Sequence, residues 1–282
     1  MSAEPRTLAP FGRRGARVTA NEAVGAYRLI RALDADGPRD PRPGQFYMLA
    51  AATDWGGGAD ERPYLPRAFS YARAREDGAL DFLLEAVGPG TKRLAELAPG
   101  EDLLLVGPLG RGFDIDRRPS TVDRRPTPLL VGGGIGAAPL LCLRDELAGA
   151  GADPSILLGF RSAAHAEAGW LFAPAEPRLA TDDGSVGRHG FVTELLREAL
   201  DQDGGMTVYA CGPPAMLEAV RALCGERGVP AQLAMESGMA CGYGACFGCV
   251  VPTKNGYVRL CVDGPVLDAA ELDTAAVPGA GH

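Results

Sequence analysis

The sequence contains no long hydrophobic run, and this absence bears first on where the protein works. No stretch approaches about 18 consecutive apolar residues, the length that a membrane-spanning helix needs. The opening segment, MSAEPRTLAPFGRRGARV, has arginines but no apolar stretch after them, so it predicts neither a signal peptide nor an anchor. We therefore expect a cytoplasmic protein without a membrane partner.

Positive charge is also scarce, and so are the motifs of hydrolases. The formal net charge is -8 and no basic run of five or more residues occurs, which argues against a nucleic-acid partner because phosphate binding needs a basic face. The sequence holds neither GxSxG nor HExxH, and its three histidines have no ligand or triad spacing. These histidines are His165, His189 and His282.

The composition itself is that of a folded globular chain. Hydrophobic residues make up 46% and charged residues 23%, and 282 residues are enough for about two domains and a short module. From Val18 to Val106, apolar runs such as GQFYMLAA, LDFLLEAV and EDLLLV are bounded by Gly, Pro or Asp, which predicts an antiparallel barrel or sandwich. The polar, proline-containing segment that starts at Asp114 predicts a linker.

After this linker the pattern changes to strand, glycine turn and helix, which predicts a parallel α/β sheet. Strands are expected at ILLGF and TVYACG. Between them, Val192, Leu195 and Leu196 begin an apolar face at helical spacing, and Pro214 lies in the first turn of a further expected helix. From about Gln232 the sequence becomes rich in Gly and Cys, and its periodicity ends.

Four of the seven cysteines crowd into 21 residues near the carboxyl end. Their spacing is Cys241-x4-Cys246-x2-Cys249 and then eleven residues to Cys261, which fits the plant-type ligand pattern for a [2Fe-2S] cluster. Each iron of such a cluster needs two cysteine sulfurs, and the glycines between the ligands allow the chain to wrap tightly. The spacing therefore predicts an iron–sulfur centre.

Two other interpretations of the cysteines remain open. A structural zinc site is the alternative for the crowded four, although zinc usually takes two CxxC-like pairs and one spacing here is four. A zinc-stabilised interaction subunit without a redox role would follow from it. Cys142 and Cys224 lie on helical patterns, so we expect them to be buried core residues.

Two short motifs in the first half point to a flavin. RAFS, from Arg67 to Ser70, begins a strand-like stretch, and an arginine there could also be a solvated charge. About twenty residues later, Gly88-Pro-Gly90-Thr91-Lys92 forms a glycine turn that opens a helix, whose free N–H groups can hold a pyrophosphate. The two motifs together favour flavin binding.

The second half carries the signals of a nucleotide site. GGGIGAAP follows the apolar strand TPLLV and precedes a helix, the context that a dinucleotide loop requires, although an ordinary glycine turn is the alternative. YACGPPAML places Cys211 and Gly212 at the carboxyl edge of the sheet, where ligands bind, and TDDGSVG is a polar turn or part of the site. Arg161 follows a strand and could meet a 2'-phosphate, so the spacing leaves NAD and NADP both open.

Taken in order, RAFS, GGGIGAAP and YACGPPAML resemble the ferredoxin reductase family. The run ESGMACGYGACFGCVVPT, with Cys261 beyond it, is similar to that of the electron transfer subunits of NAD-dependent bacterial dihydroorotate dehydrogenases, as are GPGTKRL, VGPLGRGF and TDDGSVGRHG. The resemblance extends from about Val18 to Cys261. It departs from the family at Ala68, where proline is usual, and in the short gap after Cys249, where we expect a trimmed loop.

The resemblance implies a multidomain oxidoreductase of pyrimidine biosynthesis. Its parts would be an FAD-binding antiparallel β-barrel at residues 1–118, an NAD-binding α/β domain at 119–231 and a small [2Fe-2S] module at 232–282. It also implies FAD, NAD and a partner dihydroorotate dehydrogenase catalytic subunit that carries FMN and the pyrimidine site, together forming a heterotetramer.

The resemblance also assigns roles to individual residues. Arg67 would meet the phosphate or ribitol of the flavin, Ser70 the isoalloxazine near N5, and Cys211 the nicotinamide, so Ser70 and Cys211 are the candidate catalytic residues. The implied cofactor-binding residues are Arg67, Ala68, Phe69, Ser70, Gly90, Thr91, Gly132, Gly133, Gly134, Gly136, Cys211 and Gly212. The implied metal ligands are Cys241, Cys246, Cys249 and Cys261.

These cofactors suggest an order of electron transfer. A cluster carries one electron at a time, whereas NAD accepts a hydride, and a flavin can take part in both kinds of step. The expected path therefore runs from the partner's FMN through [2Fe-2S] and FAD to NAD. The rival within the same chemistry is the flavin and iron–sulfur subunit of another NAD(P)-linked oxidoreductase, such as a transhydrogenase, hydrogenase or sulfide reductase.

Overall fold

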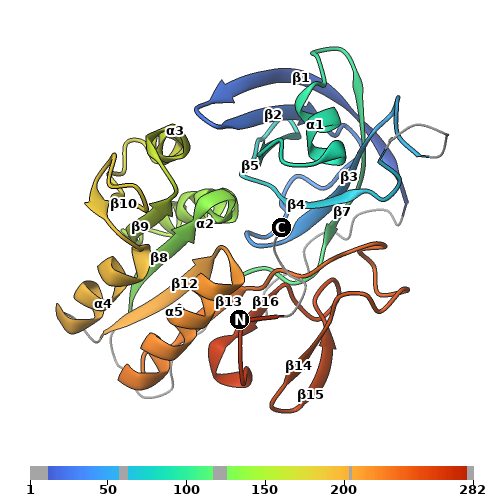
Figure 1. The fold of residues 1–282 in the computed structure, drawn as a ribbon. Coiled ribbons are helices and arrows are strands. Elements are labelled where there is room, and N and C mark those ends of the chain that lie inside the picture. The colour runs from blue at the N-terminus through green and yellow to red at the C-terminus, as the bar shows by residue number, and fades with distance from the viewer. Residues whose placement is uncertain (1–11, 57–62, 117–125, 203–204, 278–282) are drawn as a thin grey trace.

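The computed structural model describes residues 12–56, 63–116, 126–202 and 205–277. The first part is a seven-stranded antiparallel sheet with the strand order β4-β3-β7-β1-β2-β6-β5, which curls around its own core (Figure 1). A short helix, α1 (Pro89–Ala95), follows β6. The strands are β1 (Arg14–Val24), β2 (Tyr27–Leu33), β3 (Phe46–Ala51), β4 (Arg67–Ser70), β5 (Arg73–Ala74), β6 (Ala79–Leu84) and β7 (Asp102–Leu109).

The burial of these strands explains why they form. β1 alternates buried and exposed residues along its first half, as expected for a strand with one face on a core. β3 and β6 are buried along their whole length, and they correspond to the apolar runs that the sequence pattern predicted as strands. Inside the curl, the buried Tyr47 makes T-shaped, edge-to-face ring contacts with Tyr71 and with Phe82.

The second part is the expected parallel sheet, with the order β11-β10-β9-β8-β12-β13-β16. Helix α2 covers one face and helices α4 and α5 cover the other, so two apolar cores lie on opposite sides of the sheet (Figure 1). The strands are β8 (Thr127–Gly133), β9 (Ser155–Phe160), β10 (Arg178–Thr181), β11 (Arg188–His189), β12 (Met206–Cys211) and β13 (Ala231–Ala234). The helices are η1 (Gly134–Gly136), α2 (Ala137–Gly149), α3 (Ala163–Ala166), η2 (Glu167–Phe172), α4 (Val192–Gln202) and α5 (Pro214–Arg227).

The carboxyl-terminal part joins this sheet instead of standing apart. β14 (Val250–Thr253) and β15 (Gly256–Arg259) form a hairpin, and β16 (Val266–Asp268) then pairs antiparallel with β13, before a final turn, η3 (Ala269–Glu271). The expected division at 231/232 falls inside β13, because the strand continues to Ala234 to meet β16. The limits of the three parts otherwise remain a proposal.

The expected fold class is confirmed: an antiparallel flavin-type sheet, a parallel α/β sheet and a small cysteine-bearing segment. Most of the expected linker, residues 117–125, lies outside the described residues. The helices of the described residues are all too short or too polar to cross a lipid bilayer.

Candidate functional site

The two flavin motifs come together at one end of the first sheet. A Cβ atom added at Gly90 would lie only 2.7 Å from Nε of Arg67, so the guanidinium rests directly on the glycine loop. Arg67 also donates a hydrogen bond to the carbonyl of Leu65 (2.5 Å) and lies over the ring of Trp55. Glycine at position 90 thus lets the Arg67 guanidinium lie directly against the loop, which places a positive charge where a pyrophosphate could be held.

The turn before α1 is held by its own residues. Thr91 Oγ1 accepts from the Gly88 amide (2.9 Å) and donates to the Gly88 carbonyl (3.1 Å). The hydroxyl of Thr91 is therefore engaged within the turn. The amides of Gly90 and Thr91 precede the first intrahelical bond, from Lys92 to Gly88, and remain the groups suited to an anion.

The nucleotide motifs lie side by side at the carboxyl edge of the parallel sheet. Gly132 and Cys211 are direct partners in the β8 and β12 ladder. A Cβ atom at Gly136 would lie 2.3 Å from the carbonyl oxygen of Cys211, so only glycine allows the two loops this close. Gly134 has a φ of +55°, which also favours glycine. The residues predicted for the nucleotide site therefore lie together in one contiguous and mostly buried cluster, namely Gly132, Gly133, Gly134, Gly136, Cys211 and Gly212.

Cys211 itself is almost fully buried, and burial raises the pKa of its thiol well above the ordinary value. The thiol is thus neutral, able to contact a ligand but poorly suited to act as a nucleophile. Glu236, just beyond β13, acts on the same thiol, because its negative charge also raises the pKa of Cys211. Burial raises the pKa of the Glu236 carboxyl, which has no hydrogen bond or ion pair within the described part of the chain. The sequence pattern gave no signal for Glu236.

The four crowded cysteines lie as two pairs. The β14–β15 hairpin returns the chain so that Sγ of Cys249 and Sγ of Cys261 are 3.1 Å apart. Cys241 and Cys246 are linked by the Cys246 amide, which lies 3.5 Å from Sγ of Cys241. Within the described residues, no three Cys, His, Asp or Glu side chains converge on one point. Each pair could supply the two cysteine sulfurs that one iron of a [2Fe-2S] cluster needs.

Backbone amides surround the sulfur of Cys241. Burial opposes ionisation of this thiol, but the amides of Cys246, Tyr243 and Ala245 outweigh it and bring the pKa to about 6. Amides that point at sulfur stabilise thiolate charge and tune the potential of a bound cluster. Cys261 differs, since burial and the neighbouring Cys249 raise its pKa to about 12. The donor set therefore fits an iron–sulfur group.

The cysteine loop packs against the flavin sheet. A Cβ atom at Gly242 would lie 2.4 Å from Cγ of Met48 in β3, and Met48 is the ladder partner of Ala68 in the RAFS strand. Neighbouring strands lie about 4.8 Å apart. The cysteine loop thus packs on β3, the strand that pairs directly with the candidate flavin strand β4.

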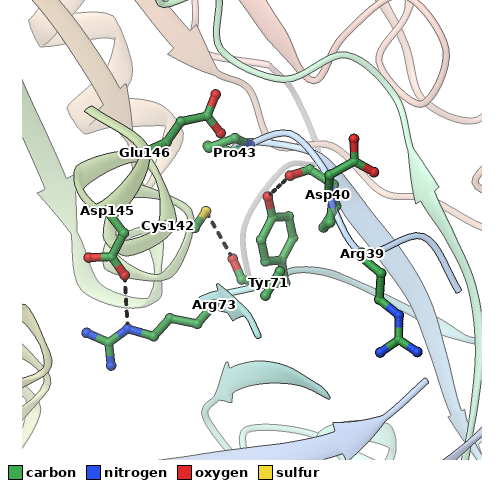
Figure 2. Close-up of a pocket in the computed structure, with 10 residues that line it drawn as sticks. Arg39, Asp40, Pro43, Tyr71, Arg73, Cys142, Asp145 and Glu146 are labelled. Carbon is green, nitrogen blue, oxygen red and sulfur yellow. Dashed lines mark hydrogen bonds and ion pairs between the residues drawn. The ribbon is translucent and has the colours of Figure 1, made fainter. Parts of the chain in front are cut away.

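A cavity of about 390 Å³ lies elsewhere, between helix α2 and the flavin sheet (Figure 2). Figure 2 shows Cys142 in its wall, where Sγ faces the carbonyl of Tyr71 at 3.6 Å, and an ion pair between Arg73 and Asp145 at 3.1 Å. Burial raises the pKa of Cys142 to about 12, so this thiol is unreactive. Cys142 and Cys224 are both buried, as the helical pattern predicted.

The fold and the three sites define a ferredoxin reductase-like iron–sulfur flavoprotein. A solved structure of an NADH-dependent reduced ferredoxin-NADP oxidoreductase superposes with a TM-score of 0.76 at 24% identity, covering 92% of this chain and 90% of that one. The ferredoxin reductase of carbazole 1,9a-dioxygenase superposes with a TM-score of 0.63 at 24% identity, over 78% and 66% of the two chains. These likenesses establish the fold.

Sequence comparison narrows the class to a family. Residues 236–273 match the model of the iron–sulfur cluster binding domain of dihydroorotate dehydrogenase B, and residues 173–222 match the oxidoreductase NAD-binding domain. The NAD(+) dihydroorotate dehydrogenase B electron transfer subunit of Clostridium acetobutylicum is 36% identical over 86% of this chain and 91% of its own. That of Geobacillus thermodenitrificans is 39% identical over 82% and 86%. The chain belongs to the family of dihydroorotate dehydrogenase B electron transfer subunits.

Proposed function

We propose that this chain carries electrons from a dihydroorotate dehydrogenase catalytic subunit to NAD in pyrimidine biosynthesis, using a [2Fe-2S] cluster and FAD. The observation that carries the proposal is the position of the flavin sheet between the two other sites. The cysteine loop rests on Met48, next to the RAFS strand, and the nucleotide edge meets the same sheet at Tyr27, whose hydroxyl lies 3.8 Å from a Cβ built on Gly134. This order matches a path from cluster to flavin to nucleotide.

Each site has residues suited to its cofactor. The Arg67 guanidinium and the amides of Gly90 and Thr91 would hold the flavin pyrophosphate, and Ala68, Phe69 and Ser70 would line its ring system. When bound, FAD exchanges single electrons on one side and a hydride on the other. The protein would supply position and exclude water, since the neutral Cys211 thiol and the Ser70 hydroxyl offer contacts and not strong acid or base groups.

The nature of the partner follows from the family. We propose a catalytic subunit that holds FMN and the pyrimidine site, assembled with this chain as a heterotetramer in the cytoplasm. Tyr243 and Phe247, both well exposed beside the cysteines, provide apolar surface for this contact. Family membership favours this partner over a transhydrogenase, hydrogenase or sulfide reductase, and the paired cysteines favour a cluster over zinc.

Paired steady-state assays on the reconstituted complex test the proposal. The first assay follows reduction of an artificial dye by NADH, and the second follows reduction of NAD by dihydroorotate. In a Cys241→Ser variant the dye assay should keep most of its activity, because hydride exchange with FAD needs no cluster. The dihydroorotate assay should collapse, because the relay between the two flavins is lost.

Cys224→Ser is the matched control, since Cys224 is buried between α5 and the sheet and should leave both activities unchanged. Association of the subunits is checked first by size-exclusion chromatography. Full dihydroorotate activity without the cluster would reject the relay order, and dihydroorotate activity in this chain alone would reject the subunit assignment. Stoichiometric zinc without iron in the anaerobically purified chain would reject the cluster.

A further inference from the structure

We propose that Glu85, which reaches across from the flavin sheet, makes this chain select NAD over NADP by engaging Arg161 at the nucleotide edge. The inference rests on the nucleotide site proposed above and assigns its specificity to a residue outside the nucleotide motifs. Glu85 directly follows β6 of the flavin sheet, whereas Arg161 directly follows β9 of the parallel sheet.

Arg161 lies where the nucleotide site proposed above would place the 2'-phosphate of NADP. It lies at the carboxyl edge of the sheet, next to β8 and its glycine loop. The polar turn after β10 is hydrogen-bonded to this point, because the Asp182 amide donates to the Phe160 carbonyl (3.0 Å) and the Asp183 amide to the Arg161 carbonyl (3.3 Å). In dinucleotide sites an acidic group near this edge accepts from the ribose of NAD, and an arginine accommodates the phosphate of NADP.

The guanidinium of Arg161 is already engaged. Its Nη2 forms an ion pair with Oε1 of Glu85 and lies 3.0 Å from Nε2 of His165. Nε2 of His165 also lies 3.4 Å from Oε1 of Glu85, and its Nδ1 lies 2.9 Å from Oγ of Ser162. Glu85 and the ring of His165, which come from different elements, therefore both contact the Arg161 head group.

The backbone fixes these partners relative to each other. The Ala26 amide, in the β1–β2 turn, donates to the Ala164 carbonyl in α3 (2.9 Å), and a Cβ atom at Gly25 would lie 1.8 Å from the same oxygen. Tyr27 packs edge-on against His165, with ring centroids 5.5 Å apart. The flavin sheet thus presses on the segment that carries Arg161, and Glu85 is held within its reach.

Charge then decides between the two nucleotides. The Asp183 carboxylate accepts from the hydroxyl and amide of Ser185, and these bonds lower its pKa, so it is ionised at this edge. Glu85 pairs with Arg161, which directly follows β9, and cancels its positive charge, so the Asp183 charge is left uncompensated by this arginine. A 2'-phosphate would meet unfavourable charge, whereas a ribose hydroxyl would find acceptors. The Arg161 side chain is 63% exposed, so a phosphate could reach it once Glu85 is neutral.

Calorimetric titration of the oxidised, FAD-loaded chain with NAD+ and with NADP+ tests this inference without relying on turnover. In Glu85→Gln the affinity for NADP+ should rise about tenfold, while that for NAD+ changes by less than about twofold. Glu85→Asp, which keeps the charge, should keep the preference for NAD+. In the Glu85→Gln/Arg161→Gln double variant the gain for NADP+ should disappear, because Arg161 is the group that Glu85 releases.

Asp201→Asn is the matched control. Asp201 pairs with Arg227 at the opposite edge of the sheet (2.8 Å), so the variant makes the same change in net charge away from the nucleotide and should leave both affinities unchanged. An equal gain for both nucleotides in Glu85→Gln, or a gain that survives in the double variant, would overturn the inference. If the wild-type chain does not bind NAD+ at all, the nucleotide site itself is misplaced and both proposals fall.

Discussion

The flavin sheet contacts the rest of the molecule on two sides, and the two contacts are chemically different. On the nucleotide side, partly exposed polar bridges are added to a shared apolar core and to the close backbone approach of Gly25 to Ala164. These bridges are Glu85 with Arg161, and Arg73 with Asp145 and the Leu171 carbonyl. On the cluster side the contacts are apolar or backbone-mediated: Gly242 lies on Met48, and the Arg111 amide donates to the Gly264 carbonyl. We call the exposed polar bridges of the nucleotide side the polar seam, and the Gly242–Met48 and Arg111–Gly264 contacts of the cluster side the close-packed joint.

The difference matches what crosses each side. A dinucleotide must enter and leave, and exposed ion pairs, worth at most about 1 kcal/mol each, allow a seam to adjust at little cost. Only electrons cross on the cluster side, so nothing there has to open and the backbones can approach closely. A close-packed joint tolerates no added atom, whereas a polar seam tolerates substitution. Three experiments probe this contrast, and a fourth tests how the last segment is attached to α5.

The largest effect is expected from Cys246→Ser, which removes one ligand from the pair with Cys241. Iron content and cluster absorbance should fall to near zero while FAD stays bound, because the flavin residues lie on other elements. Cys224→Ser should keep both cofactors. The measurement is metal analysis together with the visible and electron paramagnetic resonance spectra. Loss of the cluster in Cys224→Ser but not in Cys246→Ser would contradict the ligand assignment.

The next effect is at the close-packed joint itself. Gly242→Ala places a methyl group 2.4 Å from Cγ of Met48 at a φ of +82°, and overpacking and backbone strain together should cost about 2 to 5 kcal/mol. Urea unfolding of the loaded chain measures this cost. Adding Met48→Ala should recover part of it by making room. Gly149→Ala is the control: no atom lies within 4 Å of the new methyl group, so this variant should leave the free energy of unfolding unchanged. Equal losses of stability in Gly242→Ala and Gly149→Ala would refute the close packing of the joint.

A smaller effect is expected on the polar seam. Arg73→Ala removes the ion pair with Asp145 (3.1 Å) and the hydrogen bond to the Leu171 carbonyl (2.8 Å), at a cost of about 1 kcal/mol. The same urea experiment measures it. Arg178→Ala, which breaks an exposed pair with Glu198 between β10 and α4, away from the flavin sheet, should cost less than about 0.5 kcal/mol. If Arg73→Ala lowered the free energy of unfolding as much as Gly242→Ala, the proposed difference between the polar seam and the close-packed joint would be wrong.

The smallest effect depends on pH and concerns how the last segment is fastened to α5. Hydrogen bonds from Arg221 first, and from the Ala275 amide and Thr274, outweigh burial and lower the pKa of Glu218 from 4.5 to about 2. A lowered carboxyl pKa stabilises the fold above the ordinary pKa, and this stability is lost as the pH falls from about 4.5 to about 2. The stability difference between wild type and Glu218→Gln should therefore be constant near neutral pH and vanish over that range. A difference that persists at about pH 2 would contradict the role of the charge.

Much of the site could be predicted from sequence because its signals are local. The spacing of Cys241, Cys246 and Cys249 fixes a tight ligand loop, and the glycines of GGGIG place a turn between a strand and a helix. The apolar face that begins at Val192 is confirmed as the buried face of α4. In each case the geometry is set by residues only a few positions apart, so the pattern alone carries the information.

The sequence by itself determined the cofactor classes and the kind of each element, whereas the tertiary structure decided what faces what. The hairpin that returns Cys261 to Cys249 and the strand β16 that joins the nucleotide sheet follow no periodic pattern. Glu85 and Arg161 are 76 positions apart, and the packing of the β1–β2 turn on α3 brings them together. Such pairings depend on how whole sheets dock, since each side chain's partner is set by the shape and charge of a surface that only the folded chain creates.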